Sequence, residues 1–140
     1  MKTAELTAAE QQYIFKAFAQ VRFAQQIGIE LDEIRRGFAT LHLDIRNDLK
    51  QNSGLVHGGV IASLIDTAAA FAVMTHLAPE QTAATVDLTI HYLRPLTTGR
   101  LIARARVLQA GRRLVTSSVE VFNETENFVA AALTTFTRRP

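Results

Sequence analysis

One carboxylate stands alone in the longest apolar run of this sequence. Asp66 is the only ionisable residue between Val60 and Met74. A carboxylate is costly to move out of water unless it is paired, hydrogen-bonded or used in a reaction. Two interpretations of Asp66 follow from this position: a buried carboxylate with a structural partner, or a group that takes part in chemistry.

The residues just before this run have a second chemical property. His57, Gly58 and Gly59 stand where a helix is predicted to begin, and paired glycines let a ligand approach the backbone closely. The first N–H groups of a helix have no partner inside it and lie at the positive end of its dipole. An N–H near Gly58 is therefore suited to stabilise a carbonyl oxygen that becomes negative during acyl transfer. The same residues are also compatible with a purely structural turn.

Asp66 and Gly58 are too far apart on one helix to act on the same carbon atom. Asp66 follows Gly58 by eight residues, which is just over two turns, or about 12 Å, of α-helix. Either the two groups have different tasks or two chains combine them. A symmetric dimer with antiparallel helices would bring Asp66 of one subunit near Gly58 of its partner.

A long helix and a sheet are needed to position these residues. Residues 58–76 are apolar nearly all round, which predicts a central helix enclosed by the rest of the fold. Residues 8–26 predict an earlier helix, with Thr7 and Glu10 at the spacing of a capping box. Alternating patterns predict strands at residues 29–35, 38–46, 84–94, 101–109, 113–122 and 128–138. This order indicates an α+β fold in which an antiparallel sheet curls around the central helix.

The composition excludes several classes of function and suits one domain over residues 1–140. The chain has no cysteine, which removes disulfides, thiolate catalysis and thiolate metal sites. No histidines and carboxylates stand at metal-ligand spacing, so we expect no metal and no cofactor. With 15 basic and 13 acidic side chains and no long basic run, we expect no nucleic-acid partner.

Membrane association is not expected either. The apolar run from Val60 to Met74 is shorter than the roughly 20 residues that a membrane span needs, and Asp66 lies near its middle. No apolar core of signal-peptide length follows Met1. The sequence therefore predicts a cytoplasmic protein.

Two stretches carry a resemblance to a known family. The first is residues 55–60, which read LVHGGV and are followed by Asp66 on an apolar helix, and the second is residues 86–95. Together they resemble the hotdog-fold acyl-CoA thioesterases of the phenylacetate-pathway type, a branch related to 4-hydroxybenzoyl-CoA thioesterases. The resemblance covers roughly residues 30–138. It implies a hotdog fold, assembly into homodimers or homotetramers, and an active site at the dimer interface. Coenzyme A would be part of the substrate.

The resemblance also implies roles for individual residues. Asp66 would be the catalytic carboxylate, acting as nucleophile or as general base on water. The Gly58 N–H would polarise the thioester carbonyl group, and His57 would orient the loop or contact the substrate. Gln51 would position the water or the thioester, with its neighbour Asn52 as the rival candidate.

Further residues are expected to contact the substrate. Gly59 adjoins the turn, and Thr85 matches a position where relatives carry a hydroxyl near the carboxylate. Arg94 and Arg112 are candidates for holding the anionic coenzyme A. The loop residues of one subunit would face Asp66 and Thr85 of the partner.

Three functions follow as alternatives. The first is a thioesterase that hydrolyses an acyl- or aryl-CoA to the free acid and coenzyme A. The second is a hotdog hydratase or dehydratase of acyl thioesters, in which His57 and Asp66 would move protons. The third is a non-catalytic acyl-CoA-binding module.

Overall fold

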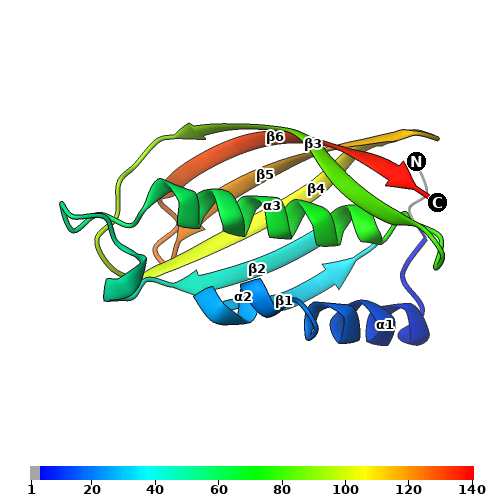
Figure 1. Cartoon of the computed structure of the whole chain (residues 1–140), viewed down its shortest axis with the longest axis horizontal. Coiled ribbons are helices and arrows are strands. Elements are labelled where there is room, and N and C mark those ends of the chain that lie inside the picture. Colours follow the sequence, from blue (N-terminus) through cyan, green and yellow to red (C-terminus); the bar gives the residue numbers. More distant parts are fainter. Residues whose placement is uncertain (1–3) are drawn as a thin grey trace.

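Within residues 4–140, which the computed structural model describes, six antiparallel strands form one sheet and a long helix lies against one of its faces (Figure 1). The strands are β1 (Ile29–Arg35), β2 (Phe38–Asp44), β3 (Thr82–Tyr92), β4 (Arg100–Ala110), β5 (Leu114–Asn123) and β6 (Phe128–Arg139). Their order across the sheet is β1-β2-β4-β5-β6-β3. The helices are α1 (Ala8–Phe18), α2 (Arg22–Ile27) and α3 (Gly58–Met74), with a short 3-10 helix, η1, at Asn47–Leu49. This arrangement confirms the predicted α+β fold.

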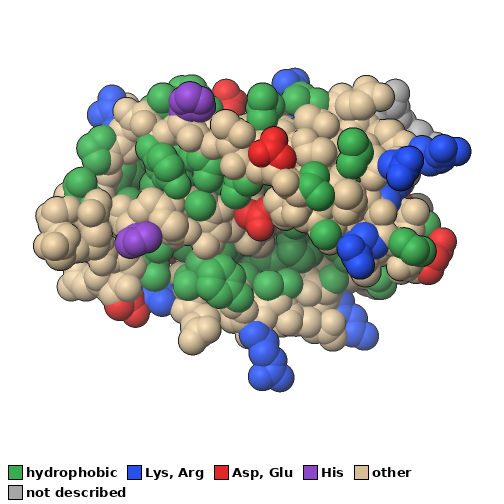
Figure 2. All heavy atoms as spheres, turned by 45° about the horizontal axis from the view of Figure 1, so that its top comes forward, with side chains coloured by type: hydrophobic (Ala, Val, Ile, Leu, Met, Phe, Trp, Pro, Cys, Tyr) green, Lys and Arg blue, Asp and Glu red, His purple; other side chains and the backbone are tan. Residues whose placement is uncertain are grey.

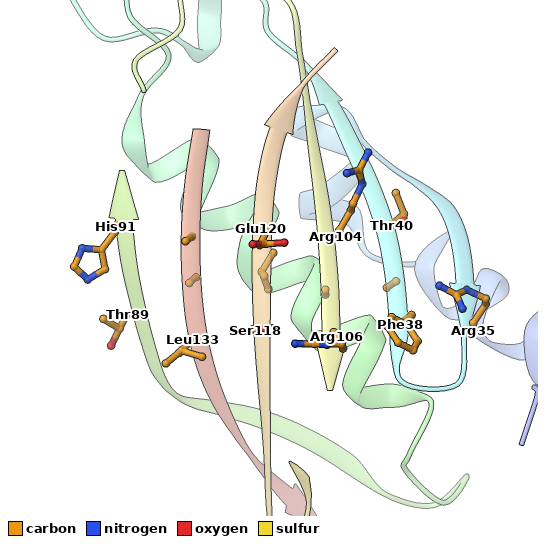
Figure 3. A pocket seen from close by; sticks show the side chains of 15 residues that line it. Arg35, Phe38, Thr40, Thr89, His91, Arg104, Arg106, Ser118, Glu120 and Leu133 are labelled. Carbon is orange, nitrogen blue, oxygen red and sulfur yellow. The ribbon is translucent and has the colours of Figure 1, made fainter. Parts of the chain in front are cut away.

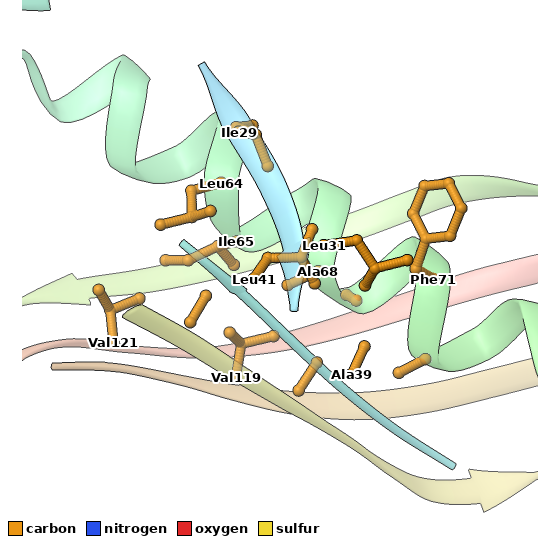
Figure 4. Packing of buried hydrophobic residues seen from close by; sticks show 14 of the residues in the cluster. Ile29, Leu31, Ala39, Leu41, Leu64, Ile65, Ala68, Phe71, Val119 and Val121 are labelled. Carbon is orange, nitrogen blue, oxygen red and sulfur yellow. The ribbon is translucent and has the colours of Figure 1, made fainter. Parts of the chain in front are cut away.

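The buried side of α3 forms the centre of the core. Leu64, Ile65 and Ala68 are fully buried on this side. Figure 4 shows them facing inward side chains of the sheet, among them Leu41 and Val119. Alanine on the helix lets the sheet approach closely, and the buried apolar area fixes the height of α3 above the strands. The core therefore determines which side of α3 remains for other contacts.

The opposite side of α3 is not covered by the sheet. Ser63, Asp66, Thr67, Ala70 and Met74 are all half-buried. Their spacing of three and four residues places them on one side of the helix. We call these five residues the open stripe. Within one chain the sheet wraps the central helix on one side and leaves this stripe half-buried on the other.

The predicted N-terminal helix over residues 8–26 is two helices, α1 and α2. Its start is as predicted, since Thr7 and Glu10 form a capping box. The chain leaves the helical conformation at Val21, which is extended. Phe18 and Ala24 are both buried, although a straight helix would place them roughly 120° apart around its axis. The break lets both side chains face the core.

Candidate active site

The N-terminus of α3 is held by His57. Its ring Nδ1 accepts a hydrogen bond of 2.8 Å from the Gly59 N–H, and its carbonyl oxygen accepts one of 2.9 Å from the Val60 N–H. A Cβ atom on Gly59 would lie 2.9 Å from the His57 Nδ1. Gly59 is therefore needed for the capping contact, and His57 acts here as the helix N-cap.

At this turn, the backbone N–H of Gly58 remains available to bind a ligand. Among residues 4–140, the hydrogen bonds at the start of α3 use the N–H groups of Gly59 and Val60 but not that of Gly58. On its other side, the Gly58 carbonyl oxygen accepts a hydrogen bond of 2.9 Å from the Tyr92 hydroxyl. This contact ties the end of β3 to the start of α3. Tyr92 was missed as a site residue in the sequence, although it falls on the same alternation as Leu88 and Ile90.

Asp66 contacts a hydroxyl from β3. The Thr85 Oγ1 donates a hydrogen bond of 2.8 Å to Asp66 Oδ1. Asp66 is half-buried and Thr85 is exposed, so the carboxylate lies at the border between the core and solvent. The structure thus places the two predicted partners in contact.

A bulge in β3 aims Thr85 at the helix. The pairing of β3 with β6 shifts by one residue between Thr85 and Asp87. Strict alternation along β3 would place Thr85 on the face opposite Leu88. The strand departs from strict alternation here, because the extra residue, Val86, reverses the facing of the residues before it. The bulge is therefore part of the Asp66 site.

The loop before α3 brings Gln51 to the same end of the molecule as Gly58. The Gln51 N–H donates to the Leu55 carbonyl oxygen at 2.8 Å, and the Val56 N–H donates to that of Leu96 at 2.8 Å. These bonds fold the loop onto itself and attach it to the segment after β3. The side chains of Gln51 and Asn52 are exposed at the loop surface.

The two candidate arginines lie near opposite ends of α3. Arg94 is exposed in the segment just after β3, on the Gly58 side. Arg112 is exposed in the turn between β4 and β5. That turn is near the far end of α3, because Arg138 donates hydrogen bonds both to Gly111 at 2.8 Å and to His76 at 2.7 Å. Within one chain, Arg112 and Gly58 are therefore not brought together.

Two separate clusters result. One is the start of α3 with His57, Gly58 and Tyr92, and the other is the pair of Asp66 and Thr85. Because α3 is continuous from Gly58 to Met74, the separation of about 12 Å between Gly58 and Asp66 stands. One chain supplies two half-sites, not one complete site.

A hollow of about 680 Å³ lies on the other face of the sheet, away from α3. Figure 3 shows Arg106, Ser118 and Leu133 on its floor, in neighbouring strands. None of the predicted site residues lines it. The hollow is therefore separate from both half-sites.

Metal and membrane features were searched in the same part of the chain. Across residues 4–140, no three His, Asp or Glu side chains gather in a way that could hold a metal ion. No helix in this range has both the length and the apolar character needed to cross a membrane.

Comparison with known proteins identifies a family and individual relatives of this chain. Residues 53–130 match the model of the thioesterase superfamily. The medium/long-chain acyl-CoA thioesterase YigI of Salmonella typhimurium is 31% identical over 129 residues, which cover 81% of this chain and 83% of YigI. The Escherichia coli PaaI protein, from the phenylacetic acid degradation operon, has a similar structure, with a TM-score of 0.87 and 26% identity. That similarity covers 93% of each chain.

Proposed function

Since this chain belongs to the thioesterase superfamily and is a hotdog-fold thioester hydrolase, we propose that it hydrolyses an acyl-CoA at a site shared by two subunits. The observation that carries this proposal is the pairing of a helix-borne carboxylate, Asp66, with the Thr85 hydroxyl, about two helical turns from an unused N–H at Gly58. The reaction releases the free acid and coenzyme A.

The dimer is proposed to form along β3 and the open stripe of α3. β3 is an edge strand, since it pairs only with β6, and an edge strand presents backbone groups that can pair with a second chain. Figure 2 shows the face of the molecule that carries β3 and α3, with hydrophobic side chains spread across it, acidic side chains near its middle and Lys and Arg side chains toward its borders. A two-fold axis at this edge would set the two α3 helices antiparallel.

This dimer would complete each site. The thioester carbonyl carbon would lie between the Gly58 N–H of one subunit and the Asp66 carboxylate of the partner. The N–H stabilises the negative charge on the carbonyl oxygen of the tetrahedral intermediate. The carbon–sulfur bond then breaks, and the coenzyme A thiolate leaves and takes up a proton. Gln51 or Asn52 positions the water or the thioester from the loop.

Asp66 can act in two ways in this geometry. As a general base it takes a proton from the water that attacks the carbonyl carbon. As a nucleophile it attacks that carbon itself and forms a mixed anhydride, which water then opens. A single turnover in oxygen-18 water detects the nucleophilic route in which water opens the anhydride at the Asp66 carboxyl carbon, because only that route releases product acid without the label and leaves the label in Asp66.

Two exposed arginines are candidates for binding coenzyme A. We propose that exposed basic side chains attract its phosphates, with Arg94, beside the Gly58 turn, as the first candidate and Arg112 as the second. No metal or redox cofactor is needed for these steps. The cytoplasmic location stays a prediction.

Two dimers are proposed to form a tetramer through the outer face of the sheet. Leu133 is 56% exposed and Phe38 is 37% exposed beside the hollow on that face. Apolar side chains at such exposure are stabilised by burial against a second copy. Light scattering in solution tests this, and a mass of two chains would leave the dimer as the functional unit.

The central test is the substitution Asp66→Asn. We expect the variant to keep its assembly state but to lose about 10²–10⁴-fold in kcat, since the amide neither accepts a proton nor attacks the thioester. Asp32→Asn, on β1 at the other edge of the sheet, is the matched control and should retain activity. A nearly normal kcat for Asp66→Asn would overturn the assignment.

The hydratase alternative is less consistent with the site. Proton exchange in a hydratase uses a histidine ring nitrogen, and the helix cap occupies the Nδ1 of His57, which leaves only its Nε2 for that role. Measuring thiol release and double-bond formation on the same acyl-CoA panel separates the hydrolase from the hydratase. Binding without turnover over that panel would favour the binding module.

A further inference from the structure

A second hollow lies at the end of α3 that is farthest from Gly58. Its volume is about 290 Å³, and it is bounded by residues 6–14, in and just before α1, and by residues 74–81, which follow α3. Ligand pockets in proteins are mostly apolar and span roughly 300–1,000 Å³. This hollow is thus large enough for part of a ligand, and α1 forms one of its walls.

Three of the polar side chains around this hollow are already engaged. Glu10 accepts a hydrogen bond from Arg36 at 3.1 Å. The Thr75 hydroxyl accepts one from the Gly37 N–H at 2.7 Å. The Gln81 side-chain oxygen accepts one of 3.0 Å from the backbone N–H of residue 78. Because these groups are satisfied within the fold, the surface that remains is formed chiefly by apolar side chains, and it is suited to an alkyl chain.

The open stripe of α3 connects Asp66 to this hollow. Asp66, Ala70 and Met74 follow one another at four-residue spacing, so they lie along one side of the helix. Met74 is both the last residue of the stripe and part of the hollow's wall. Ala70, between them, has too small a side chain to block the path. The length from Asp66 to Met74 is about 12 Å.

We propose that the acyl chain of the substrate runs along the open stripe from Asp66 and that its far end binds between α1 and Met74. This inference rests on the proposed hydrolase function and adds the class of substrate. The preferred substrates are straight-chain acyl-CoAs long enough to cover the distance from Asp66 to Met74. Tyr13 and Met74 are then the residues that select chain length. A butanoyl group ends before it reaches them.

The test compares kcat/KM for straight-chain acyl-CoAs from butanoyl to palmitoyl. Met74→Phe fills the hollow, and we expect it to lower kcat/KM for palmitoyl-CoA by about tenfold or more, since each methylene that no longer fits a pocket costs about 10-fold or more. Hydrolysis of butanoyl-CoA should fall far less, in a variant that light scattering shows to keep the wild-type assembly state. Leu114→Phe adds the same ring at an exposed leucine of β5, and this matched control should leave the whole profile unchanged.

A second variant keeps the test decisive if Met74→Phe does not fold. Tyr13 is 54% exposed, so Tyr13→Ala removes one wall of the hollow without disturbing the core. We expect a several-fold higher KM for palmitoyl-CoA and the same KM for butanoyl-CoA. An equal change at every chain length, or none, would overturn the acyl site while leaving the hydrolase intact. Failure of the wild-type protein to hydrolyse any member of the panel would instead contradict the proposed function.

Discussion

The Thr85 hydroxyl donates to one oxygen of Asp66 and leaves the other for chemistry. At the scale of single residues, we expect Thr85→Val to lower kcat by about 10- to 100-fold, because a hydrogen bond to a charged group is worth roughly 1.5–3 kcal/mol and about 1.4 kcal/mol is tenfold in rate. Thr85→Ser keeps the hydroxyl and should restore most of the rate. Steady-state kinetics of the two variants check this. Equal activity in Val and Ser variants would mean that the contact is only structural.

His76 makes the stability of the protein sensitive to acid. Its Nε2 is buried without a hydrogen-bond partner among the described residues. Burial first, and then the charges of Arg36 and Arg138, lower the pKa of His76 below 6.5. The unfolded chain therefore binds the proton more readily. Stability from neutral His76 is full above about pH 6.5 and is lost as the pH falls through the lowered, folded-state pKa.

We expect the wild-type melting temperature to drop between about pH 7 and pH 5 more steeply than that of His76→Gln, which cannot titrate. Thermal melts across this range measure the difference. His91→Gln, at an exposed position on β3, is the control and should follow the wild-type curve. Parallel curves for wild type and His76→Gln would show that His76 does not control the acid response.

At the scale of elements, the start of α3 depends on its cap. We expect His57→Ala to lower the free energy of unfolding by about 1 kcal/mol, since it removes the N-cap acceptor, and His57→Asn to recover most of it. Urea denaturation measures both. If activity recovers in His57→Asn together with stability, His57 acts by holding the Gly58 turn. Recovery of stability alone would assign His57 a direct contact with the substrate.

The elements themselves were largely predictable from the sequence, whereas their irregularities were not. Alternating patterns placed the strands to within about two residues of their observed ends. The bulge at Val86 leaves no mark, because Val86 fits the alternation of its neighbours and only the pairing with β6 displaces it. The break at Val21 could not be predicted from the sequence either, because it depends on which side chains pack in the core. Within the candidate site, the sequence pattern and the family resemblance identified Asp66 and the Gly58 turn. Tyr92 could be identified as a site residue only from the folded structure.

At the scale of the whole molecule, a shared site predicts complementation between two inactive variants. Asp66→Asn removes one half-site, and the combined variant Gln51→Ala and His57→Ala damages the other. After unfolding and joint refolding of equal amounts, half of the dimers are mixed and each has one intact site. We expect roughly a quarter of the wild-type activity. Mixing without refolding is the control, and no recovery after refolding would place both halves in one subunit.

The chain's only two tyrosines lie near the two ends of α3, and the chain has no tryptophan. Tyr92 donates to the Gly58 carbonyl oxygen at one end, and Tyr13 lines the small hollow at the other. The tyrosine fluorescence of this protein therefore comes from these two locations alone. Tyr92→Phe leaves a single emitter beside the hollow, so a titration with palmitoyl-CoA and with coenzyme A alone would reveal, without any added dye, whether an acyl chain arrives there.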